Sequence, residues 1–170
     1  MRLSLYILLV ASSVFLLAFL SFFKQARTSV RVEAVEQAQV KLDNTILQID
    51  KVLGSVEVAV KNLSWLVADK LDYPDYMYAL TQQVLRSNPH VVGSAIAFEP
   101  TYYPDKGVLF SPFSYRTKQG ICSKQLGTED YEYHYMDWYL VPKLLGTPYW
   151  SEPYFDSGGA NVVMTTYSLP

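Results

Sequence analysis

The sequence has little that could support catalysis or metal binding. It contains one cysteine, Cys122, which excludes an intrachain disulfide and a cysteine-rich zinc site. The two histidines, His90 and His134, are far apart, and neither belongs to an HExxH motif. No serine lies in a nucleophile-elbow motif, and Gly158 and Gly159 lack the following Lys-Ser or Lys-Thr of a phosphate loop. We therefore expect no enzyme activity, no cofactor and no metal site in this chain.

An excess of charge of one sign is also missing. The 14 basic residues are scattered among 16 acidic ones, and the net charge is -2. A nucleic-acid partner would require a basic patch, so we expect none. Aromatic residues are plentiful instead, with 14 Tyr, 8 Phe and 3 Trp. So many tyrosines favour amphipathic pockets or interfaces over a purely aliphatic core.

One segment near the N-terminus carries no charge at all. Leu3 to Phe23 is an uncharged run of 21 residues, and at about 1.5 Å per residue a helix of this length matches the hydrocarbon core of a bilayer. A cleaved signal peptide would have a shorter apolar region followed by a small-residue cleavage site. This run ends in Phe22, Phe23 and Lys24. We predict an uncleaved transmembrane anchor over residues 1–24.

Residues 25–72 are predicted to form a long helix for signalling or dimerisation. No proline occurs before Pro74, so the helix should continue from the membrane to about Asp69. An amphipathic helix packed on its own domain would explain the apolar pattern, and so would a parallel dimer whose seam transmits movement to the membrane. Both interpretations stay open. The apolar positions at heptad spacing are Val35, Leu42, Ile46, Ile49, Leu53, Val56, Val60, Leu63 and Val67.

Residues 73–170 contain shorter helices and strands. Proline, turn residues and β-rich apolar runs delimit them. In chain order we predict a helix at Tyr76–Arg86, strands at Val91–Phe98 and Val108–Tyr115, a short helix within Tyr131–Leu145, and extended segments at Tyr149–Tyr154 and Val162–Tyr167, joined by a hairpin-like turn at Asp156–Asn161.

Single residues refine this assignment. Pro112 suits an edge strand or a bulge, and Pro142 should interrupt the helix around Trp138. The alternating tyrosines should lie on one face of a strand, as pocket lining or as a half-buried ribbon. These tyrosines are Tyr131, Tyr133 and Tyr135.

The order of elements indicates an α+β domain with one antiparallel sheet. The chain stops at Pro170, directly after a predicted strand and without a closing element. We infer that the domain is truncated before its last strand.

Four segments within residues 90–170 resemble the Cache sensor domains of bacterial receptors, particularly the double-Cache type. They are Gly93–Pro100 (GSAIAFEP), Asp137–Tyr139 (DWY), Trp150–Asp156 (WSEPYFD) and Val162–Pro170 (VVMTTYSLP). No single segment is specific, but they occur in the order that the family shows.

This resemblance implies a PAS-like fold in which a small ligand is caged between the sheet and its covering loops. Its amino-acid-binding members use a Tyr, an Arg, a Trp, a second Tyr and a later Asp. Tyr131, Trp138 and Tyr154 match three of these, whereas Met136 occupies the arginine position. A thioether cannot hold a carboxylate as an arginine fork does, which argues against an ordinary amino acid as the ligand. Apolar, cationic or ring-bearing ligands suit aromatic walls better.

The candidate ligand-binding residues follow from this comparison and from their neighbours. Arg116, beside Tyr115, is included because it could reach the same space from the second strand. The full set is Tyr131, Trp138, Tyr139, Tyr154, Asp156, Tyr115 and Arg116.

Each candidate also has a purely structural interpretation. By residue type alone, Trp138 and Trp150 suit the core, and only the family position favours a ligand contact for Trp138. The Tyr154 phenol could satisfy a backbone group or point into a pocket. Asp156, in a glycine-rich turn, is typical of a turn former.

We predict that this chain is the extracytoplasmic ligand-sensing part of a membrane-bound receptor of the sensor kinase, phosphatase regulator or chemoreceptor type. The alternative is a membrane-tethered interaction or scaffold domain without a small-molecule site. Lys24, Arg27 and Arg31 after the anchor would by themselves place the domain in the cytoplasm. The resemblance places it outside the cytoplasm, in the periplasm and anchored in the inner membrane, and we adopt that prediction. The heptad pattern of the long helix adds the prediction of a homodimer through that helix. The ligand and the output module stay open.

Overall fold

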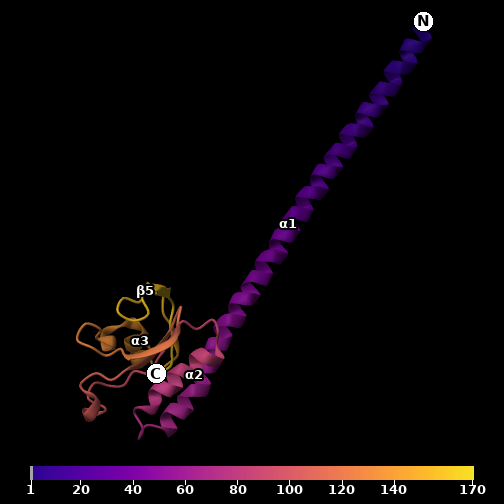
Figure 1. Cartoon of the computed structure of the whole chain (residues 1–170). Helices are drawn as coiled ribbons and strands as arrows, with labels where there is room; N and C mark the ends of the chain where they lie inside the picture. The colour runs from indigo at the N-terminus through magenta and orange to yellow at the C-terminus, as the bar shows by residue number, and fades with distance from the viewer. Residues whose placement is uncertain (1) are drawn as a thin grey trace. The chain divides into compact units, whose positions relative to one another are not determined.

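The computed structural model describes residues 2–170, which divide into two compact units, one ending at Asp50 and the other beginning at Lys51. A single helix, α1 (Arg2–Asp69), contributes to both (Figure 1). Its end at Asp69 confirms the prediction, and turn hydrogen bonds from Lys70 and Tyr73 lead the chain toward Pro74. The N-terminal part of α1 is long and apolar enough to cross a membrane, judged by length and composition.

The heptad residues of α1 have two different environments. In the second unit, Leu63 and Val67 pack against the domain's own core. In the first unit, Val35, Leu42 and Ile49 are exposed, with more than half of each side chain accessible to solvent. The last turns of α1 therefore pack on the domain of the same chain, as one of the two interpretations proposed. The heptad residues before Lys51 have no packing partner within the described chain.

Helix α2 (Tyr76–Ser87) supplies most of the core on this side. Its buried residues follow helical spacing and lie on one stripe. Met77 and Leu80 form a core cluster with Phe98 and Phe110, and the last turns of α1 cover it. The buried stripe consists of Met77, Leu80, Thr81, Val84 and Leu85.

The main sheet has three antiparallel strands in the order β1-β2-β3. They are β1 (Gly93–Ala95), β2 (Pro112–Thr117) and β3 (Gly120–Gln125). The sequence analysis missed β3, whose only aliphatic residue is Ile121. It also placed Pro112 on an edge or bulge, whereas Pro112 is the first residue of the central strand, a position that tolerates a missing N–H.

The remaining elements differ in detail from the prediction. A 3₁₀ turn, η1 (Pro104–Lys106), lies between β1 and β2, and η2 (Tyr133–Tyr135) precedes helix α3 (Asp137–Leu145). Pro142 lies inside α3 without interrupting it, because a proline there removes only one helical hydrogen bond. Gly146, with φ of 63°, ends the helix in the left-handed conformation.

The C-terminal strands form two short ladders rather than one continuous sheet. Strand β4 (Tyr149–Trp150) pairs with β7 (Tyr167–Ser168), and β5 (Tyr154–Phe155) pairs with β6 (Val163–Met164). All of these pairs are antiparallel. The predicted turn at Asp156–Asn161 connects β5 to β6 and is confirmed, but the single sheet is not.

Candidate functional site

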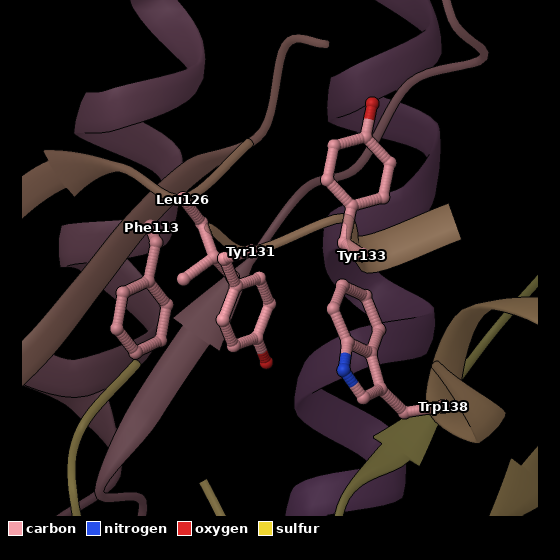
Figure 2. Close-up of a cluster of buried hydrophobic side chains, with 5 residues drawn as sticks. All are labelled: Phe113, Leu126, Tyr131, Tyr133 and Trp138. Carbon is pink, nitrogen blue, oxygen red and sulfur yellow. The ribbon is translucent and has the colours of Figure 1, made fainter. Parts of the chain in front are cut away.

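An aromatic cluster lies where the three-stranded sheet, η2, α3 and the β5-β6 turn meet. Phe113 comes from β2, Leu126 follows β3, and Tyr133 comes from η2. Tyr131 and Trp138 complete the buried group (Figure 2). The tyrosine alternation proposed from sequence is wrong for this segment, because Tyr133–Tyr135 is a 3₁₀ turn and Tyr135 is 68% exposed.

Tyr131 and Asp156 form a buried polar pair at the edge of this cluster. The Tyr131 hydroxyl donates to Asp156 Oδ1 at 2.8 Å, and Asp156 is only 4% exposed. The other carboxylate oxygen, Oδ2, accepts from the Ala160 N–H at 2.6 Å. Asp156 is therefore a turn former, as its residue type suggested, and it also fixes the direction of the Tyr131 hydroxyl.

Burial and the hydrogen bond to Asp156 raise the pKa of Tyr131 above its ordinary value. In the unfolded chain the phenol ionises near pH 10. Above that pH the unfolded state loses this proton while the folded state keeps it, so stability should fall as pH rises. We expect Tyr131→Phe to flatten this fall between about pH 9 and about pH 11, measured by urea unfolding of the chain in detergent micelles. The exposed Tyr135→Phe is the control, and equal slopes for the two variants would contradict the assignment.

Trp138 has a buried donor without an acceptor. Its side chain is 9% exposed, and no acceptor among residues 2–170 meets the geometry of a hydrogen bond to its Nε1–H. The Tyr131 hydroxyl is the nearest candidate, because burial raises the pKa of Tyr131 and the indole offsets part of that rise, but that hydroxyl is oriented toward Asp156. Figure 2 shows the indole nitrogen on the edge of the ring that faces Tyr131. A buried N–H without a partner is costly, so this donor is suited to a group that the chain itself does not supply.

Tyr154 and Tyr139 border the cluster on different sides. The Tyr154 hydroxyl lies 2.8 Å from Thr166 Oγ1, and burial raises the pKa of Tyr154. Tyr139 packs edge-on against Tyr133, and its pKa is raised by burial and by a hydrogen bond to Glu99. The structure thus brings Tyr131, Trp138, Tyr154 and Asp156 together, with Tyr139 beside them.

The two candidates on β2 point to opposite faces of the sheet, as adjacent strand residues must. Tyr115 stacks on Phe113 with ring centroids 5.5 Å apart and packs against the cluster. Arg116 lies on the α2 side, where it donates to the carbonyl oxygens of Val91 and Asn88 at 2.9 and 3.1 Å, and to that of Leu85. Arg116 therefore caps the end of α2, and its proposed reach into the site is wrong.

Two residues near the site were missed from the sequence. Lys124 lies over the Tyr115 ring at 5.2 Å, and its strand was not predicted. Thr166 was missed because its position beside Tyr154 depends on the pairing of β5 with β6. Thr166 lies in the VVMTTYSLP segment, which was interpreted as a strand and as part of the family resemblance without a role for Thr166 itself.

Comparison with known proteins identifies this arrangement. Residues 77–170, more than half of the chain, match the family model described as the first PDC sensor domain of methyl-accepting chemotaxis protein-like receptors. The chain belongs to this family. The predicted resemblance to Cache-type sensor domains is confirmed, and so is a sensory role in signal transduction. No curated protein matches the chain at a significant level.

Solved structures agree with this PDC sensor assignment. The extracellular domain of a protein assigned as a histidine kinase, soHK1S-Z6, is 32% identical with a TM-score of 0.63 and covers 72% of this chain and 48% of its own. A second such extracellular domain, mmHK1S-Z3, is 24% identical (TM-score 0.57, 71% and 46% covered). Methyl-accepting Chemotaxis protein X is 20% identical (TM-score 0.58, 81% and 56% covered). These matches confirm the PAS-like α+β fold, and the chain spans about half the length of each matched structure.

Proposed function

We propose that this PDC sensor region binds a small ligand outside the cytoplasm and belongs to a receptor anchored in the inner membrane by Leu3–Phe23. The observation that carries the ligand proposal is the buried, unpartnered Nε1–H of Trp138 beside the Tyr131–Asp156 pair. A ligand that offers an acceptor to this donor would relieve its desolvation cost. The aromatic surroundings suit a ligand with an apolar or ring-shaped body.

The ligand proposal is tested on the full chain in detergent micelles. We expect at least one member of a metabolite panel to raise the melting temperature of the chain, and Trp138→Phe to abolish that rise, because phenylalanine keeps most of the ring contact but has no donor. Trp65→Phe, which changes a tryptophan that is 63% exposed on α1, is the matched control. A ligand that stabilises the Trp138→Phe chain as strongly as the original would contradict the role of the indole.

We also propose a homodimer through α1. The division into anchor (1–24), signalling helix (25–72) and sensor domain (73–170) is part of this proposal. Exposed apolar residues at heptad spacing support it, since a second copy would bury them. With the exposed Cys122 changed to serine, single cysteines at the seam positions Ile46, Ile49 and Leu53 should crosslink in membranes, and a cysteine at Lys51, on the opposite side of the heptad, should not. Uniform or absent crosslinking would rule out this seam, and a reporter fused after Pro170 that is active only in the cytoplasm would overturn the topology.

A scaffold or interaction domain is the second candidate. It is favoured by the close packing of the five cluster residues, which are all 9% exposed or less. If no member of the panel stabilises the chain, this candidate replaces the ligand proposal.

A further inference from the structure

The β2-β3 register places one lysine on the face of the sheet that carries the aromatic cluster. Phe113 pairs with Lys124, and Ser114 pairs with Ser123. Side chains of directly paired residues lie on the same face, and those of adjacent residues lie on opposite faces. Lys124 therefore shares the face of Phe113 and Tyr115, while Arg116 and Ser114 face α2.

The ammonium group of Lys124 lies against two aromatic rings and two backbone carbonyl groups. Its Nζ donates to the carbonyl oxygens of Gly158 and Gly159 at 2.6 and 2.9 Å. It lies 5.2 Å from the Tyr115 ring centroid and 5.8 Å from that of Phe113. Within the described chain, no carboxylate forms an ion pair with it. An ammonium group has three N–H donors, so one remains after the two carbonyl contacts.

Lys124 also borders the ligand-site residues. The Gly158 carbonyl that it holds belongs to a residue packed against Tyr131, because a Cβ built on Gly158 would lie 3.2 Å from Tyr131 Cδ2. Asp156, two residues before Gly158, uses its two carboxylate oxygens to accept from Tyr131 and Ala160 and does not pair with the lysine. A half-buried cation without a counter-ion thus lies at the edge of the aromatic cluster.

We propose that Lys124 contacts a carboxylate group of the ligand, and that the site accepts small carboxylates with an aromatic or apolar body. This inference rests on the proposed ligand-binding function. A single ammonium binds a carboxylate as a point charge without the paired geometry of a guanidinium, so selectivity among carboxylates depends on the ring contacts.

The test uses three probes that share one ring: phenylacetate, its neutral amide phenylacetamide, and phenethylamine. At about ten times its Kd, phenylacetate should raise the melting temperature of the full chain in micelles by about 5 °C or more. Lys124→Met should weaken phenylacetate binding by about tenfold or more, and Lys124→Arg should restore most of it. Lys143→Met is the matched control, because Lys143 also lies over a tyrosine ring, at 5.5 Å from Tyr139, but pairs with Glu99.

Each outcome separates this inference from the proposed function. If the amide or the amine stabilises the chain as well as phenylacetate does, and Lys124→Met changes nothing, a ligand site exists but Lys124 is not its carboxylate contact. The inference would be overturned if each probe changed the melting temperature of the original chain and of Lys124→Met by the same amount. It would also be overturned if no probe changed the melting temperature of either chain. An equal loss of binding in Lys143→Met would show a general charge effect and would overturn it as well.

Discussion

Trp138→Ala should lower the free energy of unfolding of the sensor domain by about 3–5 kcal/mol, the cost of removing a buried tryptophan from a packed core. The indole lies among Tyr131, Tyr133 and Tyr139, with ring centroids 6.3 Å from Tyr133 and 6.3 Å from Tyr139. Alanine would leave a cavity that these rings cannot fill. Urea unfolding in micelles, followed by the fluorescence of Trp150 in a Trp65→Phe background, measures the loss.

Trp138→Phe separates packing from the indole donor. Phenylalanine keeps an aromatic ring and removes the unpartnered Nε1–H, whose burial costs about 1–3 kcal/mol. This relief offsets part of the lost ring contact, so we expect a net change within about 1.5 kcal/mol. A loss as large as that of Trp138→Ala would mean that the indole nitrogen has a partner in the folded chain, and would remove the main support for a ligand there.

Gly159→Ala should lower the free energy of unfolding by about 2–3 kcal/mol. A Cβ at this position would overlap the Asp156 carboxylate, and Gly159 is itself buried. The carboxylate cannot move aside without giving up its hydrogen bonds to Ala160 and Tyr131. The turn between β5 and β6 would therefore have to rearrange, and the same unfolding experiment measures the loss.

Gly54→Ala is the matched control for this substitution. A Cβ on Gly54 would meet no atom within 4 Å, and the residue lies inside α1. Alanine there should raise the free energy of unfolding by about 0.5–1 kcal/mol, because it favours the helix. A similar loss at both glycines would point to a general effect of the added methyl group and against the overlap with Asp156.

The helices were predictable because their signals are local. The absence of proline before Pro74 allowed α1 to be traced to Asp69, and the proline and turn residues on either side of α2 set its limits to within one residue. Strand β3 was not predicted because most of its residues are polar and its position is fixed by pairing with β2. No local pattern in GICSKQ expresses that pairing.

Sequence analysis identified the aromatic residues of the candidate site and Asp156, but not the lysine beside them. Tyr131, Trp138 and Tyr154 came from the family resemblance, and the structure brings them together. Arg116 was included without knowledge of the face of β2 on which it lies, and a register shift of one residue reverses that face. Because β3 was missing from the prediction, Lys124 could not be placed beside the aromatic residues.

The hydrogen bond from Trp150 Nε1 to Glu57 Oε1, at 2.9 Å, joins β4 to α1 across 93 positions of the chain. During synthesis, Glu57 emerges long before Trp150 does. At a synthesis rate of about 5–20 residues per second, Trp150 is added to the chain roughly 5–20 s after Glu57. Docking of this part of α1 through that bond therefore belongs to the late steps of folding, after α2 and the three-stranded sheet have been synthesised.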